Sequence, residues 1–269
     1  MIDINYWPAN IPSTPSNPVW PGTVKINYKP ATQDLGQAFK PHRAGTKQSH
    51  IVYILDDSGS MNPSRTVVIS AYNESLVGQR LDADRTGQPT YVSLFKFDGY
   101  NVNCLFFRKD IHLVNPLTLS DYDPKGMTNL FDAIGGVMMD LNAKLGLVDK
   151  RLRDSIIINI LTDGAENSSS VFRNADIRTM VSKAEDKNWG FQFLGANIDA
   201  FAVGSTLGFR HENTLQFNMN NVETTMAAAT RGLNDMKAAY ASGMNTAMAY
   251  ASSAFTDDER MKAVGGDDK

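Results

Sequence analysis

The stretch that decides the fold is residues 50–60, HIVYILDDSGS, in which an apolar run ends in short oxygen-bearing side chains. Residues 51–55, IVYIL, are predicted to form a buried β-strand, because the run presents no polar face to solvent. A helix is predicted to follow from about residue 63 to 79, with Val68, Tyr72 and Leu76 on one face. A buried strand followed by a helix is the first unit of a parallel α/β sheet.

The same alternation continues to residue 218. The segment 155–161, SIIINIL, is the most apolar in the chain and is therefore expected at the centre of the sheet. Further strands are predicted over residues 90–97, 103–107, 190–196 and 213–218, and further helices over residues 129–145, 171–187 and 200–207. The predicted fold is α/β: a doubly wound, mainly parallel sheet sandwiched by helices. Such a sheet binds ligands at the carboxyl ends of its strands.

Composition excludes several classes of protein. A length of 269 residues with 42% hydrophobic residues suits one large domain, or a medium domain with appendages. The net charge of −3 offers no basic stripe, so no nucleic-acid partner is expected. The single cysteine, Cys104, excludes a disulfide framework and is interpreted as a small apolar strand residue. No membrane contact is expected, since the start has no signal-peptide pattern and no apolar run is long enough to span a bilayer.

The two ends of the chain differ from this pattern. Residues 1–47 hold seven of the eleven prolines, and five basic against two acidic side chains give the segment a charge of +3. Because proline removes a backbone donor, we expect an extended N-terminal arm that contributes little to the sheet. The arm could pack on its own body, be disordered, or dock to another chain in a homo- or hetero-oligomer.

Near the other end, apolar residues recur at spacings of 4, 3, 4, 3 and 4 from Val222 to Tyr240, which predicts a helix. The stripe either packs on the sheet or forms a seam for another chain. We therefore expect an arm at 1–47, an α/β domain at 48–220, a C-terminal helical segment at 221–256 and a loose acidic tail at 257–269.

Three loops at the predicted carboxyl edge of the sheet carry oxygen ligands. Asp56, Ser58 and Ser60 alternate in the first turn, Thr128 precedes a helix, and Asp163 follows the central strand. Carboxylates and hydroxyls suit a hard cation such as Mg²⁺ or Mn²⁺. Two converging acids without a basic neighbour would repel each other unless a cation lay between them. Helix capping is the alternative role for these side chains.

Together, D-x-S-G-S at 56–60, G-x-T-x-L at 126–130 and T-D-G at 162–164 resemble the von Willebrand factor type A (VWA) family. The resemblance covers roughly residues 49–218 and implies a Rossmann-like fold of VWA type. It also implies a metal-ion-dependent adhesion site, or MIDAS. In that site Ser58 and Ser60 would ligate the metal directly and Thr128 directly or through water, whereas Asp56 and Asp163 would act mostly through water.

A further segment, FLGAN at 193–197, resembles small stand-alone prokaryotic and phage members of the family. This implies a cytoplasmic protein of a prokaryotic or phage-infected cell, or a protein of a virion. The proline-rich arm is not part of the family pattern.

The function expected from these residues is a non-enzymatic, divalent-metal-dependent protein-binding module. Two carboxylates roughly balance the cation and leave an open position for a Glu or Asp of a protein partner. One alternative is a structural or assembly protein, for example of a phage virion, that makes contacts through the arm and the C-terminal helix. Another is a Mg²⁺-dependent phosphohydrolase of the haloacid dehalogenase type, but Ser58 stands where that family needs a second aspartate.

Other polar residues near these motifs are not expected to ligate the metal. Asp57 and Asp132 are expected to face solvent or to lie beside the ligands. Glu166 and Asn167 are expected to be solvated by their loop, with shaping of the site's rim as the alternative. The four histidines show no metal-ligand spacing and are interpreted as surface or strand-edge residues.

Overall fold

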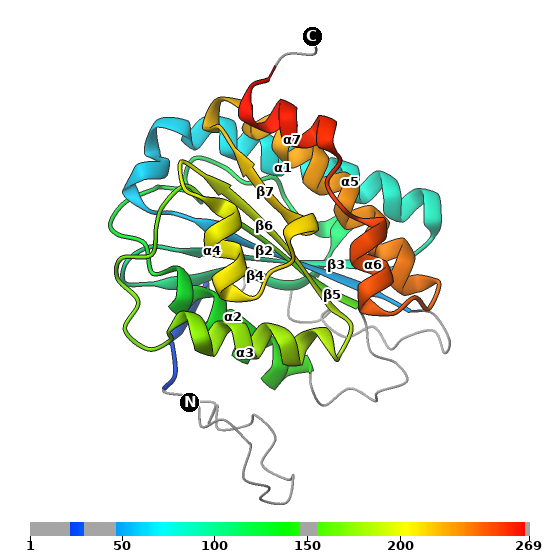
Figure 1. Cartoon of the computed structure of the whole chain (residues 1–269), viewed down its shortest axis with the longest axis horizontal. Coiled ribbons are helices and arrows are strands. Elements are labelled where there is room, and N and C mark those ends of the chain that lie inside the picture. Colours follow the sequence, from blue (N-terminus) through cyan, green and yellow to red (C-terminus); the bar gives the residue numbers. More distant parts are fainter. Residues whose placement is uncertain (1–21, 30–46, 146–154, 267–269) are drawn as a thin grey trace, which may run out of the picture.

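A seven-stranded sheet forms the middle layer of the computed structural model, which describes residues 22–29, 47–145 and 155–266 (Figure 1). The strand order is β1-β4-β3-β2-β5-β6-β7. The five strands from β3 to β7 in this order are parallel, β4 is antiparallel to β3, and β1 is parallel to β4. The strands are β1 (Ile26–Tyr28), β2 (Ser49–Asp56), β3 (Thr90–Phe97), β4 (Val102–Asp110), β5 (Ser155–Thr162), β6 (Trp189–Ala196) and β7 (Thr214–Phe217). The predicted mainly parallel sheet is confirmed.

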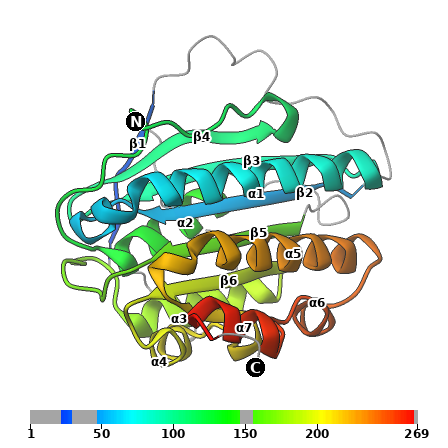
Figure 2. The same cartoon turned by 90° about the horizontal axis from the view of Figure 1, so that it is seen from above.

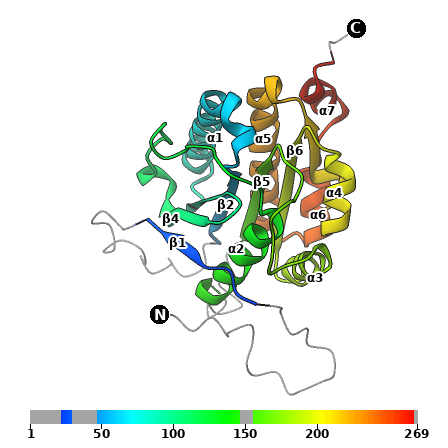
Figure 3. The same cartoon turned by 90° about the vertical axis from the view of Figure 1, so that its left-hand side faces the viewer.

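Helices cover both faces of the sheet (Figure 2, Figure 3). The core consists of one apolar cluster on each side of the sheet. Every residue of the central strands β2 and β5 is buried, as their apolar sequences require. One face carries α1 (Arg65–Thr86), α5 (Val222–Ala241), α6 (Thr246–Ser252) and α7 (Asp257–Val264). The other face carries α2 (Leu130–Leu145), α3 (Asn174–Glu185) and α4 (Ala200–Leu207).

Helices α1 and α5 lie side by side on one face and bury their apolar stripes (Figure 2). Helix α1 continues seven residues beyond its predicted end and stops at Gly87, whose φ of 68° is the left-handed conformation that glycine adopts most easily. The six stripe residues of α5 are all buried, so this stripe packs on the sheet and does not form an exposed seam. Gly190 on β6 allows close packing, because a Cβ there would overlap the Met236 sulfur of α5.

Part of the arm joins the sheet through a three-residue edge strand that the sequence pattern did not predict. No proline interrupts residues 22–29, so the backbone can donate hydrogen bonds. Residues 26–28 form β1 on the edge of β4, and Lys29 N donates to the Cys104 carbonyl at 2.9 Å. Lys29 also pairs with Asp121 at 2.8 Å, and Val24 packs against Gly136 of α2. Residues 1–21 and 30–46 of the arm lie outside the described residues.

The prediction of a loose tail from residue 257 is wrong for most of its length. Residues 257–264 form α7, which begins with a capping box between Thr256 and Glu259. The Arg260 guanidinium donates to the Thr214 carbonyl at 2.8 Å and the His211 carbonyl at 2.9 Å. These bonds and the buried Ala263 hold α7 against β7.

The interpretation of Cys104 is confirmed, whereas that of His50 is wrong. Cys104 is a buried free thiol on β4, as predicted. His50 is a correction, because it is fully buried in β2 and its Nε2 lies 2.8 Å from Ser93 Oγ. Burial, followed by the nearby positive charge of Arg108, lowers the pKa of His50 well below its ordinary value.

None of the helices in the described ranges has the length and apolar character needed to cross a membrane.

Candidate metal site

The turns after β2 and β5 meet through four of the five predicted metal-site residues. Asp56 ends β2, and its Oδ1 accepts from Ser58 N at 2.8 Å. The Ser58 and Ser60 hydroxyl oxygens lie 3.1 Å apart. Ser60 Oγ then donates to Asp163 Oδ1 at 2.6 Å, which joins two loops that are 103 residues apart in the chain. The alternation of Asp56, Ser58 and Ser60 therefore turns their side-chain oxygens toward the end of β5, the predicted central strand.

Thr128 brings the third loop to the same point. A Cβ at Gly164, the residue after Asp163, would lie 2.9 Å from Thr128 Oγ1, so this hydroxyl faces the turn after β5. Asn167 fixes the Thr128 backbone on both sides, since Thr128 N donates to Asn167 Oδ1 at 2.9 Å and Asn167 N donates to Thr128 O at 3.1 Å. The turn after β2 is tied to the Thr128 loop by Gly59 N, which donates to Gly126 O at 3.1 Å.

The site is buried on the sheet side and open at Ser60. Asp56, Ser58, Thr128 and Asp163 are buried, whereas Ser60 is exposed. Burial raises the pKa of Asp56 to about 6; hydrogen bonds from Ser58 and Thr162 oppose this rise, and the negative charge of Asp163 adds to it. Burial also raises the pKa of Asp163. A cation between the two carboxylates would favour their charged forms.

The oxygens present fit a hard divalent cation. Both Asp56 oxygens already accept protein hydrogen bonds, the second from Thr162 Oγ1 at 2.5 Å, which suits a carboxylate that reaches a metal through water. Among the described residues, no hydrogen bond occupies the Thr128 hydroxyl. No group of three or more His, Cys, Asp or Glu placed for a metal occurs in the described part of the chain, so a cation here would depend on hydroxyls and water.

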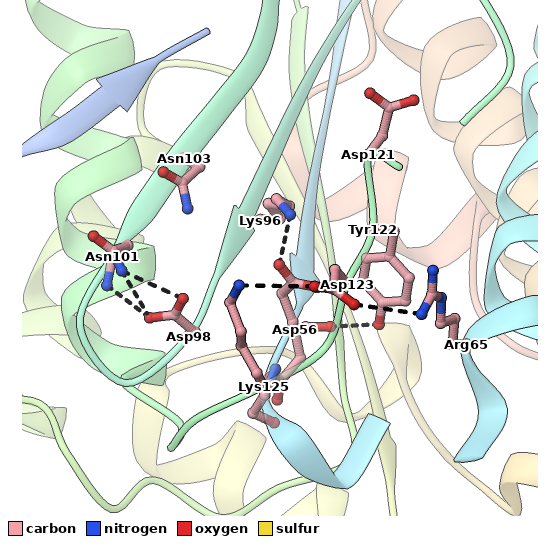
Figure 4. A network of polar contacts seen from close by, with 12 residues as sticks. Asp56, Arg65, Lys96, Asp98, Asn101, Asn103, Asp121, Tyr122, Asp123 and Lys125 are labelled. Atoms are coloured by element: carbon pink, nitrogen blue, oxygen red, sulfur yellow. Dashed lines mark hydrogen bonds and ion pairs between the residues drawn. The ribbon is translucent and has the colours of Figure 1, made fainter. Parts of the chain in front are cut away.

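Contacts behind the site hold the Asp56–Asp57 backbone, and the sequence motifs give no sign of them. Tyr122 donates its hydroxyl to the Asp56 carbonyl at 2.6 Å (Figure 4). Lys125 N donates to the Asp57 carbonyl at 2.7 Å. Asp57 itself is buried, and its Oδ2 pairs with Lys96 Nζ at 2.7 Å. Of the two roles expected for Asp57, a solvent-facing carboxylate is therefore wrong.

Two further carboxylates fix the loop after β5 to the start of α2. Asp132 is buried and accepts from the backbone N–H groups of residues 170–172 at 2.8 to 3.0 Å. Glu166 accepts from Phe131 N at 2.9 Å and from Ser169 N at 2.6 Å. Asp132 is therefore not solvent-facing, and Glu166 shapes the rim of the site rather than being simply solvated. These partners lie more than 30 residues away along the chain, except for the Glu166–Ser169 bond.

Comparisons with known proteins give a structural likeness without a sequence match. No family model matches the chain, and no curated protein matches it. Proximal thread matrix protein 1 from the mussel byssus is similar in structure, with a TM-score of 0.51 at 13% identity over 69% of this chain and 48% of its own. The pilus adhesin SpaC from Lactobacillus rhamnosus GG is similar with a TM-score of 0.51 at 14% identity, over 71% of this chain and 31% of its own.

The chain thus spans less than half of the length of either protein. At such low identity the likeness establishes the fold alone. The sheet order, the two helical layers and these structural neighbours together show that the chain has the fold of VWA domains.

Proposed function

We propose that this chain is a divalent-metal-dependent protein-binding module. Asp56, Ser58, Ser60, Thr128 and Asp163 would hold Mg²⁺ or Mn²⁺. The observation that carries the proposal is the convergence of oxygens from three loops, centred on the 2.6 Å contact between Ser60 Oγ and Asp163 Oδ1. Carboxylates and neutral hydroxyls are the oxygen ligands that hard divalent cations take.

The charge at the site favours an acidic protein partner. Asp56 and Asp163 together offset the two positive charges of the cation, and the three hydroxyls are neutral and add no further negative charge. The cation therefore remains attractive to a further anionic oxygen at its solvent side, where Ser60 is exposed. A Glu or Asp carboxylate on a partner protein would complete the coordination there.

We propose binding rather than catalysis because the neighbouring charged groups already have structural roles. Asp57 pairs with Lys96, and Glu166 and Asp132 hold backbone N–H groups. Ser58 occupies the position of the second aspartate that a haloacid dehalogenase would use as general acid and base. In this proposal the metal supplies a coordination position for the partner, and the residues around it orient that position.

Calorimetric titration with Mg²⁺ and Mn²⁺ tests the metal site. We expect one site per chain and a rise in melting temperature, because a ligand of the native state stabilises it by mass action. Asp163→Ala should abolish both. The matched control is Asp84→Ala, which removes an exposed carboxylate near the end of α1 and should leave binding unchanged. Metal binding that survives the double change Asp56→Ala and Asp163→Ala would show that the assignment is wrong.

Affinity capture with and without EDTA tests the partner. Thr128→Ala should weaken capture while circular dichroism confirms the fold, because it removes one neutral ligand. Asp57→Asn is the control, since its side chain faces Lys96 and keeps a hydrogen-bonding oxygen. Capture that is unaffected by EDTA, and equal for wild type and Thr128→Ala, would favour an assembly protein that makes its contacts through the arm.

A further inference from the structure

Beside the metal loops lies an apolar ledge, which we define as the side chains of Tyr100 and Met127. We infer that this ledge binds a large apolar side chain next to the acidic residue of the partner. The inference rests on the proposed function and adds the chemistry of the partner: a protein loop that carries Glu or Asp with an apolar or aromatic neighbour.

Both ledge residues are unusually exposed for their type. Tyr100 retains 81% of its accessible surface and Met127 retains 44%. Met127 is adjacent in sequence to Thr128, whose hydroxyl is a proposed ligand. Single exposed apolar residues are common on protein surfaces, but two of them on neighbouring loops, one of which carries a proposed ligand, are a reason to expect contact with a partner.

The turn that carries Tyr100 packs closely against Met127 through Gly99. A Cβ at Gly99 would lie 2.6 Å from Met127 Cβ and 3.0 Å from Met127 N, so only a glycine lets the β3–β4 turn approach the metal loop this closely. Tyr100 follows Gly99 directly. The ledge therefore has a fixed place relative to Thr128.

The turn that carries Tyr100 is also fixed internally. Asp98 is buried, and its Oδ1 accepts from Tyr100 N at 2.8 Å and from Asn101 N at 2.9 Å. The Asn101 side chain bonds the same carboxylate (Figure 4). An aromatic side chain on a fixed turn loses little conformational entropy when a partner covers it, which is the property of an interface anchor.

Charge at the rim selects the acidic part of the partner. The Lys125 side chain is 73% exposed, two residues before Met127, and its ion pair with Asp123 is a loose one at 3.7 Å. Across the site, the loop after β5 exposes Ala165 and Asn167, which are small or polar. The apolar preference should therefore apply to one flank of the acidic residue and not to both.

A cyclic peptide library with a fixed central Glu and random flanking residues tests the inference. Selection on the full chain in Mg²⁺ should enrich large apolar residues on one side of the Glu. Tyr100→Ser and Met127→Ser should each weaken the selected peptide about tenfold, as expected when part of an apolar side chain is no longer buried. Their Mg²⁺ affinity, measured by calorimetry, should stay unchanged. Leu81→Ser is the matched control, because Leu81 is 64% exposed on α1, away from the loops.

The outcomes separate this inference from the proposed function. Peptides that require both Glu and Mg²⁺ but show no apolar flank, or that bind the double variant Tyr100→Ser and Met127→Ser equally well, would overturn the ledge alone. If no peptide requires Mg²⁺, or if Gln replaces Glu without loss, the proposed function fails and the ledge fails with it.

Discussion

The substitution Gly164→Ala tests the metal site without removing a ligand or a charge. The added Cβ would lie 2.9 Å from Thr128 Oγ1, about 0.5 Å short of an ordinary contact. Thr128 cannot retreat as a whole, because Asn167 holds its backbone N–H and carbonyl. The hydroxyl must therefore rotate or the turn must shift, at a cost of about 0.5 to 1.5 kcal/mol. Stability without metal should fall by no more than that amount.

Metal affinity should respond more strongly than stability. Mg²⁺ holds its oxygens at about 2.0 to 2.1 Å in near-ideal geometry, so displacement of one hydroxyl by several tenths of an ångström removes it as a ligand. We expect about tenfold weaker binding, equivalent to about 1.4 kcal/mol. Calorimetry on wild type, Gly164→Ala, Thr128→Ala and the double variant forms a thermodynamic cycle.

The double variant separates loss of the Thr128 ligand from other effects of the substitution. In the Thr128→Ala background the alanine at position 164 has no hydroxyl to displace, so it should cause no further loss of metal affinity. Wild-type affinity in Gly164→Ala would mean that Thr128 is not a ligand or that the turn relaxes freely. Equal losses in both backgrounds would mean that Gly164 acts through the Asp163 turn instead.

The other predictions concern the fold. Since burial lowers the pKa of His50, the unfolded chain binds a proton below about pH 6.5 that the folded chain does not, and stability should fall with decreasing pH by up to about 1.4 kcal/mol per unit. Urea unfolding between about pH 7.5 and 5.5 should show this slope reduced in His50→Gln, and identical slopes would refute it. Gly190→Ala should cost about 1 to 3 kcal/mol through overlap with Met236, and Met236→Ala should relieve most of that cost in the double variant. Deleting residues 1–45 should cost about 2 kcal/mol through loss of β1 and Val24, yet leave cooperative melting and metal binding; loss of the cooperative transition would place the arm in the core.

The strands were the most predictable part of the fold. Strands β2, β3, β5 and β6 are rich in apolar and β-branched residues, and their observed ends lie within two residues of the predicted ones. Helix α1 was predicted too short because its buried face beyond Leu76 carries the polar residues Gln79 and Asp82, which interrupt the apolar pattern. Strand β1 was missed because its three residues, in the segment between Pro21 and Pro30, carry too little pattern. Helix α7 had a usable signal in the Thr256 and Glu259 capping box, but its acidic composition suggested a tail.

The part of the site whose ligating residues lie close together in the sequence was predictable. Asp56, Ser58 and Ser60 follow one strand directly, so their convergence needs only the end of β2. The contacts of Tyr122, Asp132 and Asn167 with distant backbone atoms depend on how the loops pass one another, which no periodicity records. The close approach of Gly99 to Met127 depends likewise on how two distant loops pack.

Segments outside the expected domain of residues 48–220 cover or extend both edges of the sheet. Strand β1 lies along β4 at one edge, and Arg260 of α7 bonds the Thr214 carbonyl of β7 at the other. Exposed strand edges present unpaired backbone groups that recruit further strands. An excised 48–220 fragment would therefore leave both edges exposed and would also lose α5, whose buried stripe covers one face of the sheet, so we expect it to self-associate. Domain boundaries taken from the family resemblance would thus remove β1 and α7, which cover the sheet edges against pairing with strands of other chains.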